Sequence, residues 1–243
     1  MLKKCTAEFI GTFAIVFFGC GAVAINQLSN GALGLIGIAI VFGLVVMAMI
    51  YSFGHTSGAH INPAVTIALA YSNRFDKKEV FPYIAAQCTA ALSASTIHLI
   101  VLKPLFIKQE IANKMSYGVT TPLDSSFITA LVIEAILTFF LMAVILGSAV
   151  DKKAASGFAG LAIGSTVAFL ILFGGPLTGA SMNPARSLGP ALISGNLNQF
   201  FAYLIGPTLG ALGAVVLYDK TQNVNEGLVC QSESEPELTK SES

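Results

Sequence analysis

Long apolar stretches alternate with short polar segments along most of the chain. A transmembrane helix needs about 20 consecutive, mainly apolar residues. Stretches of roughly that length lie at residues 7–26, 33–53, 82–102, 127–150, 157–174 and 199–218. The pattern therefore predicts an all-α membrane protein with six transmembrane helices.

Two further apolar runs are too short to span a bilayer. They cover residues 63–71 and 184–193, and each follows an Asn-Pro pair that begins at Asn62 or Asn183. Asn is a favoured helix N-cap, and Pro is well tolerated at the first helical position. Nine helical residues cover about 14 Å, near half of a hydrocarbon core of about 30 Å. Two re-entrant half-helices that enter from opposite sides would bring both Asn side chains together at the midplane, as in a pore.

The chain repeats itself at a spacing of about 120 residues. Glu8 and Glu134 each lie early in a span and are followed by Thr four residues later, and the two Asn-Pro-Ala motifs fall 121 residues apart. Residues 1–102 and 127–218 are therefore interpreted as two copies of one three-helix unit. Because each copy has an odd number of spans, the copies must have opposite orientations, which predicts an inverted repeat with its site at the midplane.

The distribution of basic residues predicts the orientation in the membrane. One side carries Lys3, Lys4, Arg74, Lys77, Lys78, Lys152, Lys153 and Lys220. The other side carries Lys103, Lys108 and Lys114, all within the long connection 103–126. The positive-inside rule then predicts that both termini lie in the cytoplasm and that 103–126 is an extracellular loop. The membrane is expected to be a cell membrane, either plasma or inner. The polar, Ser- and Glu-rich segment 219–243 is expected to be a disordered cytoplasmic tail.

Composition excludes several other classes. Charged residues are 11% of the chain, against about 25% in a soluble domain, and the formal net charge is zero. A net charge of zero, without a basic cluster, gives no support for a nucleic-acid partner. No nucleophile–base pair, phosphate loop or metal-ligand cluster occurs, so we expect neither an enzyme nor a cofactor or bound metal. Lys3 and the apolar run after it imitate a signal peptide, but Glu8 and the length of the run favour a first transmembrane span.

The segments before the two half-helices are expected to line the pore with backbone carbonyls. A residue before Pro avoids the helical region, and irregular backbone at membrane depth must line a wet cavity or be satisfied by protein. The residues concerned are Gly58, Ala59, His60, Ile61, Gly179, Ala180, Ser181 and Met182. Asn62 and Asn183 can cap with their side-chain oxygens and keep their NH₂ groups free as central donors. Two positive helix ends that meet there would repel cations.

Four ionisable side chains at membrane depth require an interpretation. Glu8 and Glu134 are expected to accept hydrogen bonds from the re-entrant backbone, and a proton relay is the alternative. His60 is expected to have a satisfied ring, with pH sensing as the alternative. Arg186, three residues after Asn183, is functional by default because an intramembrane Arg is costly.

The motifs Asn62-Pro63-Ala64 and Asn183-Pro184-Ala185, each preceded by Gly-Ala-x-x, resemble the aquaporin (major intrinsic protein) family. The resemblance covers about residues 5–220. It implies six tilted helices and two half-helices per subunit, with the two Asn residues as central donors. It also implies a homotetramer in which each subunit has its own pore.

The resemblance further implies a constriction outward of the Asn pair. By spacing from the motifs, the four residues of this selectivity filter are Phe42, Ile171, Ala180 and Arg186. Ile171 stands where water-selective members have His, and Ala180 where many have Thr or Cys. The set is similar to that of archaeal-type aquaporins with Ser replaced by Ala, and the motif surroundings resemble nodulin-26-like channels.

The sequence therefore predicts a passive channel for water and small neutral solutes such as glycerol that excludes ions and protons. A secondary transporter and an adhesive membrane protein with a closed pore remain alternatives. Within the channel hypothesis, a strictly water-selective aquaporin and a channel for metalloid acids also remain open.

Overall fold

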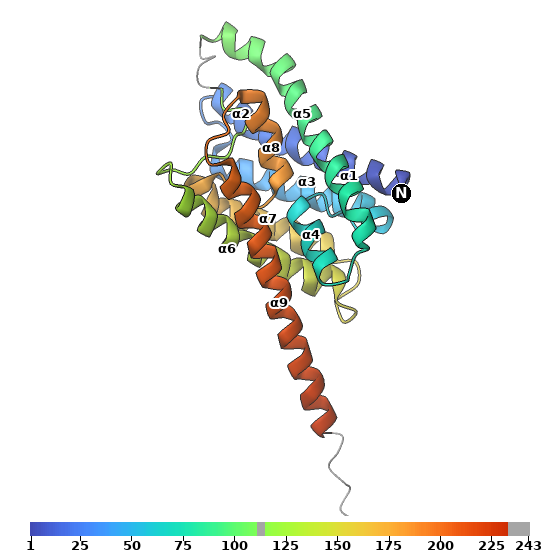
Figure 1. Ribbon diagram of the computed structural model, residues 1–243. Helices are drawn as coiled ribbons and strands as arrows, with labels where there is room; N and C mark the ends of the chain where they lie inside the picture. Colours follow the sequence, from blue (N-terminus) through green and yellow to red (C-terminus); the bar gives the residue numbers. More distant parts are fainter. Residues whose placement is uncertain (111–114, 233–243) are drawn as a thin grey trace, which may run out of the picture.

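The computed structural model describes residues 1–110 and 115–232, without the side chains of 222–232, and these residues contain helices and no strands. Six helical segments are long and apolar enough to cross a membrane, which confirms the predicted fold class. In chain order they are α1 (Leu2–Ala14) continued through a π-helical turn (Ile15–Cys20) into α2 (Gly21–Leu28), α3 (Gly34–Ser57), α5 (Val80–Lys108), α6 (Phe127–Ile145) with a π-helical turn (Leu146–Val150), α7 (Ala159–Thr178) and α9 (Phe200–Ser232). Figure 1 shows them packed into one bundle around the two short helices α4 and α8.

The two short helices begin at the Asn-Pro pairs. Helix α4 covers Pro63–Tyr71 and α8 covers Pro184–Ser194. The Asn62 side chain accepts a hydrogen bond from the Ala64 N–H at 2.9 Å, and Asn183 accepts one from the Ala185 N–H at 3.0 Å. Both Asn residues are in the extended backbone region that an N-cap adopts. The local sequence therefore determines where each half-helix starts.

Two helix ends differ from the boundaries that hydropathy predicts. Helix α5 continues to Lys108, so the connection between the repeats begins at Gln109 instead of 103. Helix α9 continues to Ser232, although the disordered tail is predicted from 219; residues 233–243 lie outside the described residues. Hydropathy marks where side chains stop being apolar, whereas the i to i−4 hydrogen-bond ladder can continue into water.

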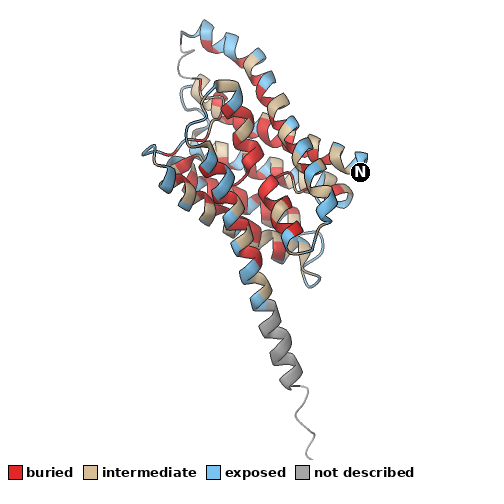
Figure 2. Ribbon diagram, in the orientation of Figure 1, coloured by how far each residue is buried: buried red, intermediate tan, exposed pale blue. Residues whose placement is uncertain are grey.

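Small residues allow the long helices to approach one another closely. A Cβ added to Gly43 of α3 would lie 2.6 Å from the Gly164 carbonyl oxygen of α7, and the reverse distance is also 2.6 Å. A Cβ added to Gly206 of α9 would lie 2.8 Å from the Leu131 carbonyl oxygen of α6, and one added to Gly210 would come closer still to the Ala135 carbonyl oxygen. Figure 2 shows the buried residues in red, and they are concentrated in the middle of the bundle, where the half-helices lie. Many large apolar side chains on the outside are exposed, as expected for a surface that faces lipid.

Candidate functional site

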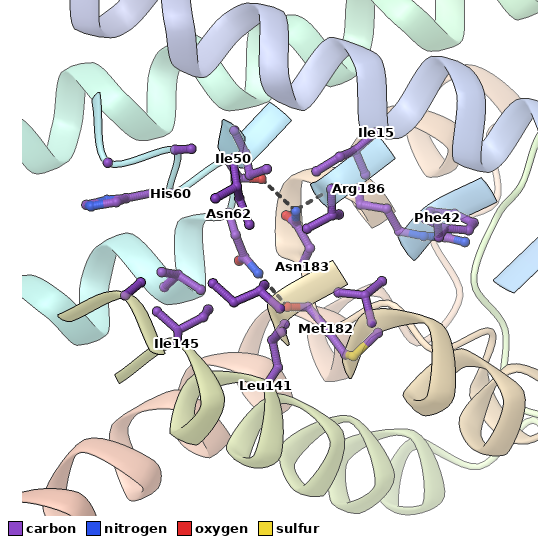
Figure 3. Close-up of a pocket in the computed structure, with 18 of the residues that line it drawn as sticks. Ile15, Phe42, Ile50, His60, Asn62, Leu141, Ile145, Met182, Asn183 and Arg186 are labelled. Atoms are coloured by element: carbon purple, nitrogen blue, oxygen red, sulfur yellow. Dashed lines mark hydrogen bonds between the residues drawn. The ribbon is translucent and has the colours of Figure 1, made fainter. Parts of the chain in front are cut away.

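A cavity of about 310 Å³ lies between the helices and passes the tips of both half-helices. Its walls are mainly aliphatic side chains from the first span, α3, α6 and α7. The polar groups come from the two loops that precede α4 and α8, and from Arg186 and Arg74. Figure 3 shows these side chains gathered around one open space. The cavity is therefore apolar on most sides, with polar groups confined to a few places.

The two Asn side chains meet at the middle of this cavity and each bonds the opposite loop. Asn62 Nδ2 donates to the Met182 carbonyl oxygen at 2.7 Å, and Asn183 Nδ2 donates to the Ile61 carbonyl oxygen at 2.8 Å (Figure 3). From the sequence, both NH₂ groups were expected to remain free as central donors. Because each amide nitrogen has two hydrogens, one N–H joins the two repeats and the second remains for a solute in the cavity.

The loops before the half-helices have an unusual backbone. Ala59 and Ile61 have φ values of +45° and +44°, and Ala180 and Met182 have φ values of +42° and +55°. Residues with a side chain rarely adopt this left-handed region, and each such residue costs on the order of 1–3 kcal/mol. The same alternation in both repeats means that the surrounding structure must hold both loops in place.

Seven of the eight residues expected to contribute pore carbonyls line the cavity: Gly58, Ala59, His60, Ile61, Ala180, Ser181 and Met182. The eighth, Gly179, is not among the lining residues. It packs instead against Thr120, whose Cγ2 would lie 3.1 Å from an added Cβ. The ring of His60 is held by Thr66, with 3.2 Å between Nδ1 and Oγ1, and packs edgewise on Phe75.

The buried carboxyl group of Glu8 holds the first loop. Its Oε1 accepts hydrogen bonds from the His60 N–H at 2.9 Å and the Ser57 hydroxyl at 2.7 Å. Its Oε2 accepts from the Ile61 N–H at 2.6 Å and from the Gln87 amide at 2.8 Å. Both backbone N–H groups belong to the strained loop, so Glu8 compensates for part of the cost of its conformation.

Glu134 makes the equivalent bonds in the second repeat. It accepts from the Ser181 N–H at 2.9 Å, from the Met182 N–H at 2.7 Å and from the Thr178 hydroxyl at 2.7 Å. Neither acid is among the residues that line the cavity. This geometry favours the structural role over a proton relay, because the donors that surround each carboxyl group belong to the protein.

Two buried tyrosines, which were not predicted from the sequence to have this role, support the re-entrant loops. The Tyr83 hydroxyl donates to the Ser57 carbonyl oxygen at 2.9 Å, and the Tyr203 hydroxyl donates to the Thr178 carbonyl oxygen at 2.7 Å. Each bond fixes the last residue of the helix that leads into a re-entrant loop. The two tyrosines lie 120 residues apart, which is the spacing of the internal repeat, and this spacing could have marked them as equivalent residues of the two repeats.

The four expected filter residues all line this cavity. The Arg186 guanidinium lies over the Phe42 ring, with Cζ 5.1 Å from the ring centroid (Figure 3). Ile171 and Ala180 contribute apolar wall. Arg186 Nη1 donates to the Gly118 carbonyl oxygen at 2.7 Å, and no described residue bonds its buried Nε. Phe42, Ile171 and Ala180 thus give this part of the cavity apolar walls, and Arg186 gives it one cationic donor.

Gly118 is a positioning residue with no signal in the sequence, since it lies in a long connection without periodicity. Its φ of +77° favours glycine. A Cβ at this position would lie 2.9 Å from the Cα of Cys20 and 3.1 Å from its carbonyl oxygen. Substitution would therefore move the carbonyl group that holds Arg186.

Gly118→Ala is expected to weaken discrimination between neutral solutes. Loss of one hydrogen bond of about 1 kcal/mol corresponds to about a fivefold change in the glycerol-to-erythritol permeability ratio. Vesicle swelling in each solute measures the ratio. Gly157→Ala is the matched control, because Gly157 has φ +83° but nothing within 4 Å of an added Cβ. Equal ratios in both variants would contradict the role assigned to Gly118.

The opposite end of the cavity lies near the face that carries the N-terminus. Arg74 lines the cavity there and forms an ion pair with Asp219. The hydrogen bond from Arg74 to that carboxylate raises the pKa of Arg74, so the residue stays charged. On the same face Lys4 pairs with Glu79, and the Tyr218 hydroxyl donates to Asp151 at 2.6 Å. The Tyr218 and Lys153 donors lower the pKa of Asp151, which therefore stays ionised at neutral pH.

Comparison with known proteins agrees with this geometry. Residues 1–218 match the family model described as "Major intrinsic protein". The chain belongs to the major intrinsic protein family. It is 43% identical over 228 residues to Aquaporin NIP1-1 of Oryza sativa subsp. japonica, covering 93% of this chain and 77% of that protein. It is 47% identical over 219 residues to Aquaporin NIP3-1 of Arabidopsis thaliana, covering 89% and 67%.

A solved structure has the same architecture. The aquaglyceroporin from Plasmodium falciparum superposes with a TM-score of 0.77 at 31% sequence identity, covering 90% of this chain and 96% of that one. This major intrinsic protein is thus a multi-pass, non-enzymatic membrane channel for water and small neutral solutes.

Proposed function

We propose that the pore passively conducts water together with compact hydroxylated solutes such as glycerol, and that it excludes ions and protons. The observation that carries this proposal is the composition of the constriction. Phe42, Ile171 and Ala180 offer no side-chain hydrogen bonds, and Arg186 supplies donors from one side only. A solute with hydroxyls on one side and an apolar face on the other loses little when it sheds water there.

Ion exclusion rests on the centre of the pore. The N-termini of α4 and α8 both end at the Asn pair, and a helix N-terminus has a partial positive charge of roughly half an elementary charge. Glu8 and Glu134 are bonded by protein donors and do not line the cavity, so among the described residues no carboxylate is exposed to a solute beside the Asn pair. A cation would lose its hydration shell against two positive helix ends.

Asn62→Asp and Asn183→Asp are each expected to admit cations. The new carboxylate would cancel part of the positive field and would lose the N–H that bonds the opposite loop. Potassium flux into vesicles, followed with an ion-sensitive dye, measures the leak. Asn73→Asp, in the exposed turn after α4, is the control and should stay as ion-tight as the parent. If all four proteins exclude potassium equally, the barrier lies elsewhere.

A panel of solutes tests the proposed selectivity and the alternatives together. We expect fast osmotic shrinkage of the vesicles through water flux, and volume recovery in glycerol and in uncharged metalloid acids such as boric acid. The rates of solute entry should rise linearly with solute concentration and need no ion gradient. Saturation or ion coupling would favour a secondary transporter. Absence of all flux would favour an adhesive protein with a closed pore, and water flux alone would favour a strictly water-selective aquaporin.

The proposed setting is a homotetramer in a plasma or inner membrane, with one pore per subunit and both termini in the cytoplasm. Family membership supports the assembly. The orientation is supported by the basic residues of the N-terminal face, which include Lys4 and Arg74. Access of a membrane-impermeant reagent to Cys5 from one side only would test the orientation.

A further inference from the structure

A second cavity lies on the outside of the bundle and shares no lining residue with the pore cavity. It has a volume of about 430 Å³ and is lined by Tyr71, Leu209, Leu212, Gly213, Val216, Leu217 and Lys220. Except for Tyr71, these residues recur at intervals of three or four along α9, so they form one face of that helix. Tyr71 is the last residue of the half-helix α4. We call this cavity the α4–α9 groove.

The groove is apolar along its length and polar at one end. Leu209, Val216 and Leu217 are 54%, 41% and 51% exposed, although each has a large apolar side chain. Lys220 and Tyr71 provide an ammonium group and a phenol, and no acidic side chain is among the lining residues. The polar end lies beside the Arg74–Asp219 ion pair, on the face that carries the N-terminus.

Lys220 is the cation at this end that has no ion pair among the described side chains. Within residues 1–110 and 115–221, where side chains are described, no carboxylate forms an ion pair with it. The neighbouring cation Arg74 is already paired with Asp219. Among the described side chains, the polar end therefore has one positive charge that is not paired, which complements an anionic group.

The length of the groove matches one membrane leaflet. From Leu209 to Lys220 the helix advances eleven residues, which is about 16 Å at 1.5 Å per residue. Half of a hydrocarbon core of about 30 Å is about 15 Å. An acyl chain along the groove would thus reach from the bilayer midplane to the level of the head groups.

We propose that the α4–α9 groove binds one anionic phospholipid of the leaflet on the N-terminal face. An acyl chain lies along α9, and the phosphate accepts hydrogen bonds from Lys220 and the Tyr71 hydroxyl. A second copy of the chain does not fit this surface as well. Seven residues line the groove, whereas a stable protein interface uses roughly 20–30 residues on each side.

Lipid in the groove would stabilise the pore, since α4 links the groove to Asn62. Ala64 and Ala68 of α4 pack in one buried cluster with Ala211 and Val215 of α9. Tyr71 ends the helix that Asn62 begins. A lipid that holds Tyr71 against α9 therefore opposes movement of the half-helix away from the bundle.

The test is thermal unfolding of the purified protein in detergent during titration with phosphatidylglycerol, phosphatidylcholine or soluble glycerol 3-phosphate. We expect phosphatidylglycerol to raise the unfolding temperature at the lowest concentration, and glycerol 3-phosphate to have no effect because it lacks a chain. Lys220→Gln should raise the phosphatidylglycerol midpoint about fivefold, the equivalent of about 1 kcal/mol for one basic residue.

Two further variants complete the test. Gly213→Leu fills the groove, since an added Cβ there meets only the Phe139 ring at 3.7 Å, and it should abolish stabilisation by both lipids. Lys78→Gln removes an exposed lysine outside the groove and should match the parent. Equal midpoints for the two phospholipids, an unchanged midpoint in Lys220→Gln, or an effect of glycerol 3-phosphate alone would overturn the proposal. So would a change of oligomeric mass in Gly213→Leu with lipid stabilisation intact, because that places a second copy on this face.

Discussion

Glu8→Gln and Glu134→Gln are each expected to lower the unfolding temperature of the protein by several degrees while some water flux remains. A Gln side chain keeps one acceptor oxygen and places an NH₂ group where the second oxygen was. In either orientation this NH₂ group faces a backbone N–H of the re-entrant loop, from His60 or Ile61 in the first repeat. One buried, unsatisfied donor costs on the order of 1–3 kcal/mol, and each kcal/mol corresponds to about 2–4 °C in a protein of this size.

Glu79→Gln is the matched control for this prediction. Glu79 also accepts hydrogen bonds, from Lys4, but this ion pair is at the surface, where such pairs contribute about 0–1 kcal/mol. Thermal unfolding in detergent and water permeability per mole of protein should be measured for all three variants. Full stability of Glu8→Gln or Glu134→Gln, combined with a loss of proton-dependent flux, would instead support the relay hypothesis.

The double substitution Ile171→His with Ala180→Thr is expected to suppress glycerol passage at least about tenfold while water flux persists. It narrows the constriction and adds donors where the parent has apolar walls beside Arg186. The apolar face of glycerol then meets polar groups and less space, whereas water gains partners. A tenfold effect corresponds to about 1.4 kcal/mol in the barrier.

Val167→Thr provides the comparison for the filter variant. Val167 lines the same cavity one turn before Ile171 on α7, and the substitution adds a hydroxyl with little change in volume. Stopped-flow swelling in glycerol should show the parent rate for this variant. If the double variant also passes glycerol at the parent rate, then Ile171 and Ala180 do not form the constriction.

The fold was largely predictable because each of its main features has a local cause. Spans follow from apolar length, and the half-helices begin at Asn62 and Asn183 because Asn caps and Pro starts a helix. Helix ends outside the membrane were less predictable. Hydropathy ends where polar residues begin, yet α5 continues to Lys108.

The site was predictable where the repeat or a motif marked it. The spacing of the Asn-Pro-Ala motifs and of Glu8 and Glu134 indicated residues that the structure brings to one cavity or one loop. Gly118 could not be found in this way, because its contact with Arg186 joins residues 68 positions apart through an irregular connection. The crossed bonds of Asn62 and Asn183 were also missed, since local sequence gives no distance between two loops.

Water flux, glycerol flux and proton exclusion can be measured together in one vesicle preparation. Vesicles that contain the purified protein and an entrapped pH dye are subjected first to an osmotic gradient and then to a pH gradient, with protein-free vesicles as the reference. We expect fast osmotic shrinkage and fast recovery in glycerol, with proton flux no greater than in protein-free vesicles. Proton flux that rises with the amount of protein, or shrinkage no faster than in protein-free vesicles, would contradict it.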